Sequence, residues 1–320
     1  MRRILIPLAA SVLLAASAVQ PALAQTPAAP QAVGDVQLIT VPQLWDNMYS
    51  TVRHADGSWQ PWKVQYHTNV AGQLTSVVIN GADHIFSVYT PQSPAIYWYL
   101  HTIRNADGTW TGGTVPEPSS EIADAQAVAN LDGHIALVRK KGNVLTLFIE
   151  QSDGTWSAPE TVPTSGAIGS FAVTANGGVL RVVSTSDGTR IGDYDRAADG
   201  TWSQPSWTPL NAARQVAVAQ VGADLQVAAV ANNDVWHAVR HADGTWDAFA
   251  RVEGEAGTID AVEQIAVTNS SGALHLVAVT ANGGLYHTIR FADHTWQRFG
   301  DVASVLGPQP VAYLTLAGES

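Results

Sequence analysis

Residues 273–302 read ALHLVAVTANGGLYHTIRFADHTWQRFGDV, and this stretch contains the pattern that decides the fold. Ala273 to Thr280 and Leu285 to Phe291 are short runs of aliphatic, β-branched and aromatic residues, separated by a turn that contains Asn-Gly. A similar run, Val262 to Asn269, precedes them, and another, Trp296 to Val302, follows an Asp-containing turn. Short runs of this kind between turn residues predict successive antiparallel strands. The stretch therefore predicts one unit of four strands.

The turn before the last strand recurs along the chain as a phrase that ends in tryptophan, and its copies lie 44 to 51 residues apart. A unit that returns at this spacing cannot bury its apolar faces alone, so it stacks against copies of itself. Four strands per repeat is the count of a propeller blade. The six copies are Asp56-Gly57-Ser58-Trp59, Asp107-Gly108-Thr109-Trp110, Asp153-Gly154-Thr155-Trp156, Asp199-Gly200-Thr201-Trp202, Asp243-Gly244-Thr245-Trp246 and Asp293-His294-Thr295-Trp296.

The two ends of the repeat region carry complementary parts of one blade. Val36 to Val41, Leu44 to Arg53 and Trp59 to Val64 match the second, third and fourth strands of a unit, with no first strand before them. Val311 to Leu316 looks like a first strand with nothing after it. We therefore expect an all-β fold, a six-bladed β-propeller of four-stranded antiparallel blades, with the ring closed by the C-terminal strand joining the N-terminal blade. An open β-solenoid is the alternative, but its repeats are usually shorter. After the first 24 residues, no segment sustains a helical apolar period without a Gly, Pro or Asn-Gly interruption.

The phrase itself has a simple structural interpretation. Asp and Gly suit a tight turn, because Gly accepts a positive φ and Asp bonds nearby backbone amides. The tryptophan, at the same place in every blade, is expected to be buried against the neighbouring blade. His294 replaces the glycine in the last copy, which predicts an altered or strained turn there.

Composition bounds the class of protein. Residues 1–24 have the charged start, apolar run and small-residue end of a secretory signal peptide, which predicts secretion. Residues 25–34 are expected to be a flexible segment and 35–320 the propeller. The chain has no cysteine and a net charge of −11, so disulfides and thiolate sites are excluded, and nucleic acid is disfavoured as a partner. No membrane span is expected, and assembly into a homo-oligomer stays open.

Two positions on the third strand of each blade offer candidate ligand-binding residues. Arginine recurs six residues before the phrase tryptophan in five copies, histidine recurs nine residues before it in three, and the residue beside that position is often aromatic. A guanidinium fork near an aromatic face suits sugar hydroxyls and the apolar face of a pyranose. Structural roles, as strand-end caps for arginine and packing for histidine, remain the alternative. The candidates are Arg53, Arg104, Arg196, Arg240, Arg290, His101, His237, His287, Tyr49, Trp236 and Tyr286.

The stretch Leu274 to Val302 resembles the blades of bacterial and invertebrate β-propeller lectins, the tectonin-like and fucose-lectin-like group. The resemblance implies sugar sites in shallow pockets between adjacent blades, without a cofactor, and adds Trp98 to the aromatic candidates. The blades around Arg240 with Trp236 and around Arg290 with Tyr286 are expected to hold the best sites. The blade with Glu150 and Leu147 at the matching positions is expected to hold none.

The function that fits best is secreted carbohydrate binding without catalysis, with glycans or glycoconjugates as partners. No metal-ligand spacing or nucleophile motif occurs, and the carboxylates fall at irregular places, so no catalytic residues are assigned. The first alternative is a cell-surface or protein-interaction scaffold without sugar binding. The second is an exported glycan-processing hydrolase or lyase, which would need a cluster of carboxylates and histidines near the axis of the ring.

Overall fold

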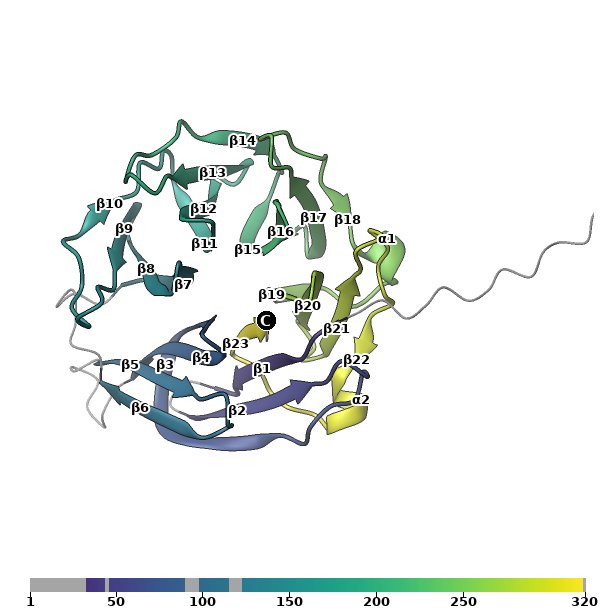
Figure 1. Ribbon diagram of the computed structural model, residues 1–320. Helices are drawn as coiled ribbons and strands as arrows, with labels where there is room; N and C mark the ends of the chain where they lie inside the picture. The colour runs from purple at the N-terminus through teal and green to yellow at the C-terminus, as the bar shows by residue number, and fades with distance from the viewer. Residues whose placement is uncertain (1–32, 44–45, 90–97, 115–122, 319–320) are drawn as a thin grey trace, which may run out of the picture. The chain divides into compact units, whose positions relative to one another are not determined.

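The computed structural model describes residues 33–43, 46–89, 98–114 and 123–318, and residues 31–320 form one compact unit. In this unit the strands form six antiparallel blades arranged around a central axis (Figure 1). The predicted six-bladed, all-β propeller is thus confirmed. The predicted signal peptide, residues 1–24, and all of the 25–34 segment except its last two residues lie outside the described residues.

Four blades are built from consecutive strands. Blade 3 contains β7 (Ala125–Leu131), β8 (His134–Lys141), β9 (Val144–Ile149) and β10 (Glu160–Thr161), and blade 4 contains β11 (Ile168–Asn176), β12 (Val179–Ser186), β13 (Arg190–Arg196) and β14 (Ser206–Pro209). Blade 5 contains β15 (Ala213–Val221), β16 (Asp224–Ala231), β17 (Asp234–Arg240) and β18 (Ala250–Arg251), and blade 6 contains β19 (Val262–Ser270), β20 (Ala273–Thr280), β21 (Leu285–Arg290) and β22 (Gly300–Asp301).

Blades 1 and 2 share one long strand. β3 (Lys63–Ile79) pairs through its first half with β2 (Asp46–Arg53) and through its second half with β4 (Ala82–Tyr89). It is therefore the outermost strand of blade 1 and the innermost strand of blade 2, which is completed by β5 (Trp98–Arg104) and β6 (Trp110–Thr114).

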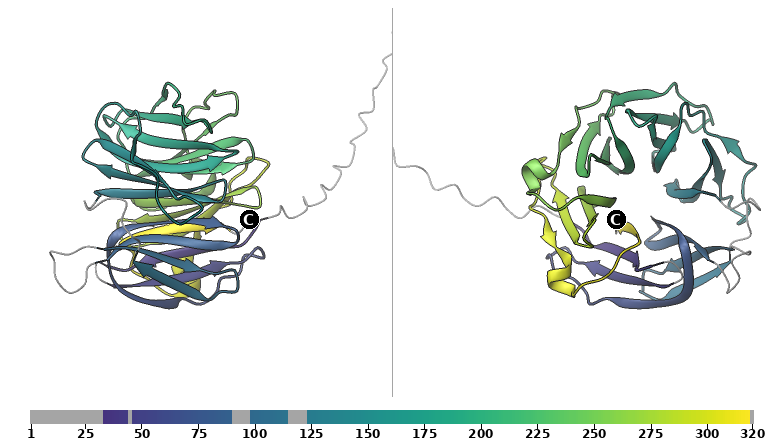
Figure 2. Two further views of the ribbon diagram at one scale, coloured as in Figure 1. Left: turned by 60° about the vertical axis from the view of Figure 1, so that its left-hand side comes forward. Right: turned by 180° about the vertical axis from the view of Figure 1, so that it is seen from behind.

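The C-terminal strand closes the ring, as the complementary ends predicted. β23 (Tyr313–Gly318) lies beside β1 (Val36–Val41) in antiparallel register, from Val36 opposite Gly318 to Val41 opposite Tyr313. β1 in turn pairs with β2, so blade 1 is assembled from both ends of the chain (Figure 2). Hydrogen bonds and packing between β23 and β1, rather than a covalent link, close the ring.

The apolar core is divided into clusters that each join two adjacent blades. The cluster between blades 3 and 4, for example, combines Leu145 and Leu147 with Leu180 and Val182. Every phrase tryptophan packs on such a cluster, formed by its own blade and the preceding one. The predicted packing between blades is confirmed, although the six tryptophans are partly rather than fully buried.

The fourth strands differ from the expected continuous run. In blade 6, Trp296 bridges Arg290 but Gly300 pairs with His287, so the five residues from Trp296 to Gly300 stand opposite only four on β21. This one-residue bulge breaks the predicted strand Trp296 to Val302, and Val302 instead begins a helix. The two short helices that the sequence did not predict are α1 (Glu253–Ala256) and α2 (Val302–Leu306), which follow β18 and β22.

All six phrase turns have the same hydrogen bonds. In each of them an Asp Oδ1 accepts from the backbone N and the hydroxyl of the Ser or Thr two residues later, at 2.6–3.0 Å. The residue between them has positive φ: 87° at Gly244 and 72° at His294. The turn with His294 therefore keeps its shape and holds a side chain in the left-handed region.

Replacing His294 with Gly is expected to stabilise the protein by about 1 kcal/mol, because glycine adopts a positive φ without the steric cost that other residues bear. The reverse exchange, Gly244→His, should destabilise the protein by a similar amount. Urea denaturation of both variants checks this. A destabilised His294→Gly variant would mean that the imidazole makes contacts worth more than the backbone cost.

Candidate functional site

The arginine and the histidine of one third strand point to different neighbouring blades. The two positions are three residues apart, and successive side chains of a strand alternate between its faces. On β21, Arg290 reaches back to Gln226 of blade 5, whereas the His287 ring meets Trp59 of blade 1. Each inter-blade site therefore combines the histidine position of one blade with the arginine and the phrase tryptophan of the next.

The interface between blades 5 and 6 contains a pocket of about 140 Å³. Arg290 and Trp296 line it from blade 6 and His237 from blade 5. Gln226 Oε1 lies 2.9 Å from His237 Nε2 and accepts a hydrogen bond from Arg290 Nη1 at 3.4 Å. Trp296 meets the His237 ring edge to face, with 5.3 Å between ring centroids.

Two carboxylates complete the electrostatics of this pocket. Asp247 and Glu255 both line the pocket. Partial burial lowers the pKa of Arg290, and the negative charges of these two carboxylates oppose that shift. Burial, and secondarily the Arg290 charge, lowers the pKa of His237 to about 3, so this histidine is neutral at physiological pH. The pocket thus offers guanidinium N–H donors, carboxylate acceptors and an indole, the groups that recognise a polyhydroxylated ring.

The interface between blades 6 and 1 has a similar composition but is more closed. His275 Nδ1 lies 3.1 Å from His287 Nε2, and Trp59 meets His287 edge to face at 5.6 Å. Arg53 is only 7% exposed and donates to the backbone oxygen of His54 at 3.2 Å. Its guanidinium is therefore largely withdrawn from solvent.

Between blades 4 and 5 the arginine is used internally. Asp193 takes the histidine position, and Arg240 forms ion pairs with it at 2.5 Å and with Asp195 at 3.0 Å. Burial, and then the Asp195 charge, raises the pKa of Asp193 to about 7, while Arg240 opposes this shift. These ion pairs occupy the place that corresponds to the blade 5/6 pocket. Arg240 and His237, three residues apart on β17, lie in different interfaces.

Between blades 3 and 4 the arginine is paired with a carboxylate that the sequence analysis did not single out. Arg196 binds both oxygens of Glu160 at 2.9–3.1 Å, and Trp202 Nε1 donates to the same carboxylate at 2.6 Å. Partial burial raises the pKa of Glu160, but the hydrogen bonds from Arg196 and Trp202 outweigh burial and hold the pKa below its ordinary value. The Glu160 side chain is partly exposed, and a ligand could reach it. Because Arg196 already binds both of its oxygens, such a ligand would share the carboxylate with Arg196.

The remaining candidates are dispersed. His101 Nε2 lies 2.9 Å from His84 Nδ1, and the His101 ring stacks on Phe86. Arg104 stands opposite Trp110 in blade 2. Tyr286 packs edge to face with Phe299, four positions along β21 from Arg290, and does not line the pocket at Arg290. Trp236 Nε1 donates to Ala231 O, and Tyr49 stands opposite Thr40. The side chain of Trp98 lies outside the described residues.

Gln226, which contacts both His237 and Arg290 behind the pocket lining, has a sequence signal that was overlooked. It belongs to a repeated polar position near the start of the second strand, flanked by aliphatic residues, as in Leu225-Gln226-Val227 and Leu274-His275-Leu276. In blades 5 and 6 this residue bonds the third-strand histidine. A polar residue inside an otherwise apolar strand was therefore the available clue.

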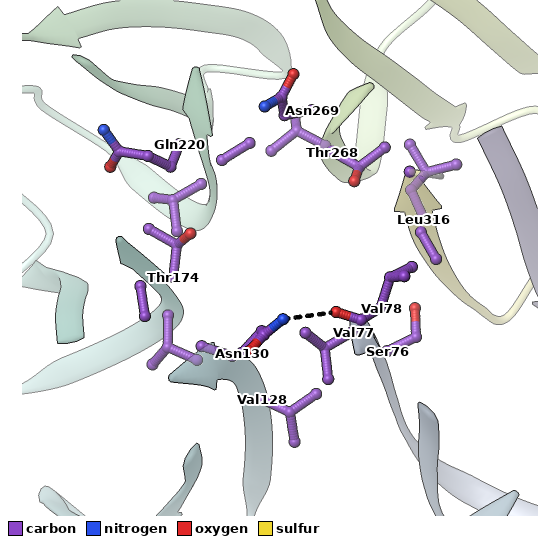
Figure 3. Close-up of a pocket in the computed structure, with 18 of the residues that line it drawn as sticks. Ser76, Val77, Val78, Val128, Asn130, Thr174, Gln220, Thr268, Asn269 and Leu316 are labelled. Atoms are coloured by element: carbon purple, nitrogen blue, oxygen red, sulfur yellow. Dashed lines mark hydrogen bonds between the residues drawn. The ribbon is translucent and has the colours of Figure 1, made fainter. Parts of the chain in front are cut away.

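A further pocket, of about 440 Å³, lies on the axis of the ring (Figure 3). Its lining includes Asn130, Thr174, Gln220 and Asn269, and Asn130 Nδ2 donates to Val78 O at 3.0 Å. None of the described residues that line it is titratable. The hydrolase or lyase alternative required carboxylates and histidines near the axis, so this lining does not favour it.

The described residues contain neither a membrane-spanning helix nor a metal-binding cluster. Neither helix in that part of the chain is long and apolar enough to cross a membrane. Within the same residues, no cluster of three or more His, Cys, Asp or Glu side chains could hold a metal ion.

The buried histidines predict loss of stability in acid. Burial lowers the pKa of His101 to about 4 and that of His275 to about 3, whereas an unfolded histidine titrates near 6.5. Between these values the unfolded chain binds more protons, so stability falls as the pH drops below about 6.5. His275→Gln, which copies the Gln226–His237 pair of blade 5, should lose less stability than the parent protein between pH 7 and pH 4.5.

Urea denaturation at the two pH values measures this difference. Replacing the exposed His294 with Gln is the control and should leave the acid loss unchanged. Asp193 has the opposite pH dependence, because its stabilising contribution falls as the pH rises toward 7. Asp193 is present in the parent and in both variants, so its contribution cancels when their acid losses are compared. Equal acid losses in His275→Gln and the parent would contradict the prediction.

Comparison with known proteins identifies the fold. No family model and no curated protein matches the sequence. The fucose-specific lectin from Aleuria aurantia matches with a TM-score of 0.60 at 11% identity, over 89% of this chain and 100% of that chain. The lectin BP39L from Burkholderia pseudomallei matches with 0.57 at 13%, over 85% and 84%. A chain of the nidogen–laminin complex matches with 0.58 at 9%, over 88% and 98%. This chain therefore has the six-bladed propeller fold found in fucose-binding lectins.

Proposed function

We propose that this protein is a secreted carbohydrate-binding propeller that holds a sugar, without chemistry, in the pocket between blades 5 and 6. The observation that carries the proposal is the convergence of Arg290, Trp296 and the His237–Gln226 pair at one interface between blades. Secretion rests on the signal-peptide pattern of residues 1–24.

The recognition chemistry follows from the groups present. Arg290 can donate to adjacent hydroxyls, Glu255 and Asp247 can accept from others, and the indole of Trp296 can pack on the C–H face of a pyranose. The lectin from Aleuria aurantia is fucose-specific, so fucosides are the first ligands to test on this protein.

The fold alone does not choose between sugar and protein partners, since a chain of the nidogen–laminin complex also matches it. A protein-interaction scaffold therefore remains the second candidate. The polar pocket with its indole favours the sugar, because a protein interface would ordinarily use a broad surface rather than a cavity of this size.

Arg290→Ala is expected to weaken sugar binding at this site at least about tenfold, which corresponds to the loss of one charge-assisted hydrogen bond. A glycan array with the protein lacking residues 1–24 identifies a ligand, and calorimetry with that ligand measures the change. The control is Arg298→Ala, an exposed arginine of the same blade that does not line the pocket. A folded protein that binds no glycan on the array would favour the scaffold instead.

A further inference from the structure

The interface between blades 4 and 5 contains a second pocket, of about 570 Å³, which differs in place and composition from the pocket at Arg290. Its apolar walls are Trp236, Trp246 and Phe249 of blade 5 and Leu210 with Pro209 of blade 4. It includes neither Arg240 nor Asp193, whose ion pair fills the place equivalent to the blade 5/6 pocket.

The pocket is open because the connection between blades 4 and 5 is short. Only residues 210–212 separate β14 from β15, whereas ten residues, including α1, separate β18 from β19. At the blade 5/6 interface, the backbone of Ala256 in α1 accepts a hydrogen bond from Phe299 N at 2.8 Å, and both residues share one apolar cluster. Phe249 is the counterpart of Phe299 in the repeat, and no helix follows β14 to cover it.

The two tryptophans are fixed with their polar edges already bonded. Trp236 Nε1 donates to Ala231 O at 3.0 Å, and Trp246 Nε1 donates to Ser206 Oγ at 2.9 Å. Both indoles are partly exposed, so they present apolar ring surface to the pocket rather than N–H groups. A ligand that packs on them need not displace a hydrogen bond.

The rim of this pocket is polar. Asn211 and Asn232 expose carboxamides that can both donate and accept, and Asp247 adds a carboxylate acceptor. Asp247 is the one charged residue among those that line the pocket, so an anionic ligand is disfavoured. An apolar wall of fixed aromatic rings below a rim of amides suits a neutral ring with one C–H face and an edge of hydroxyls.

We infer that the blade 4/5 pocket is a second sugar site, which binds a neutral hexopyranose by packing its C–H face on Trp236 and Trp246. Gluco- and galactopyranosides, which carry such a face, are the class of ligand. This inference extends the proposed carbohydrate function to a site that uses no arginine, and it does not require the pocket at Arg290 to bind.

The test follows the indole N–H signals of the uniformly ¹⁵N-labelled full chain by NMR during titration with methyl β-D-glucopyranoside and methyl β-D-galactopyranoside. The signals of Trp236 and Trp246 report the blade 4/5 pocket, and that of Trp296 reports the blade 5/6 pocket. We expect Trp236 and Trp246 to shift in a saturable way, in the parent and equally in Arg290→Ala.

Two variants test the pocket itself. Asn232→Gly removes one rim amide at a residue whose φ of 52° glycine adopts readily, and it should weaken binding at least about fivefold. Trp236→Phe reduces the apolar wall and should weaken binding further. If Trp236→Phe does not fold, Asn232→Gly still decides, because its side chain is exposed.

A matched ligand separates a sugar site from a general apolar pocket. Cyclohexylmethanol has the ring but lacks the ring hydroxyls, and it should bind at least about tenfold more weakly than the sugars. Equal or tighter binding overturns the sugar assignment. Shifts confined to Trp296 overturn this inference and leave the proposed function standing, and no shifts with any glycoside overturn the inference. Shifts confined to Trp236 and Trp246 support the inference and leave the blade 5/6 pocket to its own test with fucosides.

Discussion

Removing residues 311–320 is expected to open the ring and lower the melting temperature by roughly 10 °C or more. The truncation deletes β23, whose six residues pair with β1, and takes Leu314 and Leu316 out of the cluster between blades 6 and 1. Loss of a buried leucine alone costs about 2–5 kcal/mol, so the two together predict a loss of about 4–10 kcal/mol before the lost pairing is counted. β1 would also become an unpaired edge prone to association.

Differential scanning calorimetry of the truncated chain measures the effect. The matched control removes residues 319–320 alone, which leaves β23 intact and should not change the melting temperature. An unchanged melt after removal of residues 311–320 would show that closure between the first and last blades contributes little to stability.

Trp202→Ala is expected to cost about 3 kcal/mol, at the lower end for loss of a large aromatic because the indole is partly buried. Trp202 packs on the cluster between blades 3 and 4, and its Nε1 holds the carboxylate of Glu160 that also binds Arg196. The substitution therefore removes apolar contact across the interface and one partner of a charged group.

Trp202→Phe separates these two contributions. It keeps an aromatic ring on the cluster and loses the hydrogen bond to Glu160, so we expect a smaller loss of about 1–2 kcal/mol. Urea denaturation of both variants gives the comparison. Full stability in Trp202→Ala would mean that the phrase tryptophans are not the packing units between blades, and would instead favour a ligand-binding role for them.

The inter-blade sites illustrate where prediction from the sequence succeeded and where it stopped. The recurrence of arginine and histidine was visible, and each arginine was expected to act with an aromatic residue of its own blade, as Arg240 with Trp236 and Arg290 with Tyr286. Because they are three residues apart on β21, Arg290 and His287 face different blades. Arg290 meets Gln226, which lies 64 residues away in the sequence, and His287 meets Trp59 near the other end of the chain. Whether a site is open then depends on the partner position, which is Asp193 beside Arg240 and His237 beside Arg290.

The sequence by itself determined the architecture. The chain contains six spaced copies of one phrase, four strand-like runs per copy and complementary parts of one blade at its two ends. These features predict stacked blades and a closed ring, and they can be read from the sequence because they are local patterns and their number. The tertiary structure alone decided which side chains meet. Contacts such as Arg290 with Gln226, and the pocket left open by the short connection before β15, depend on how adjacent blades face each other, and no local pattern records that relation.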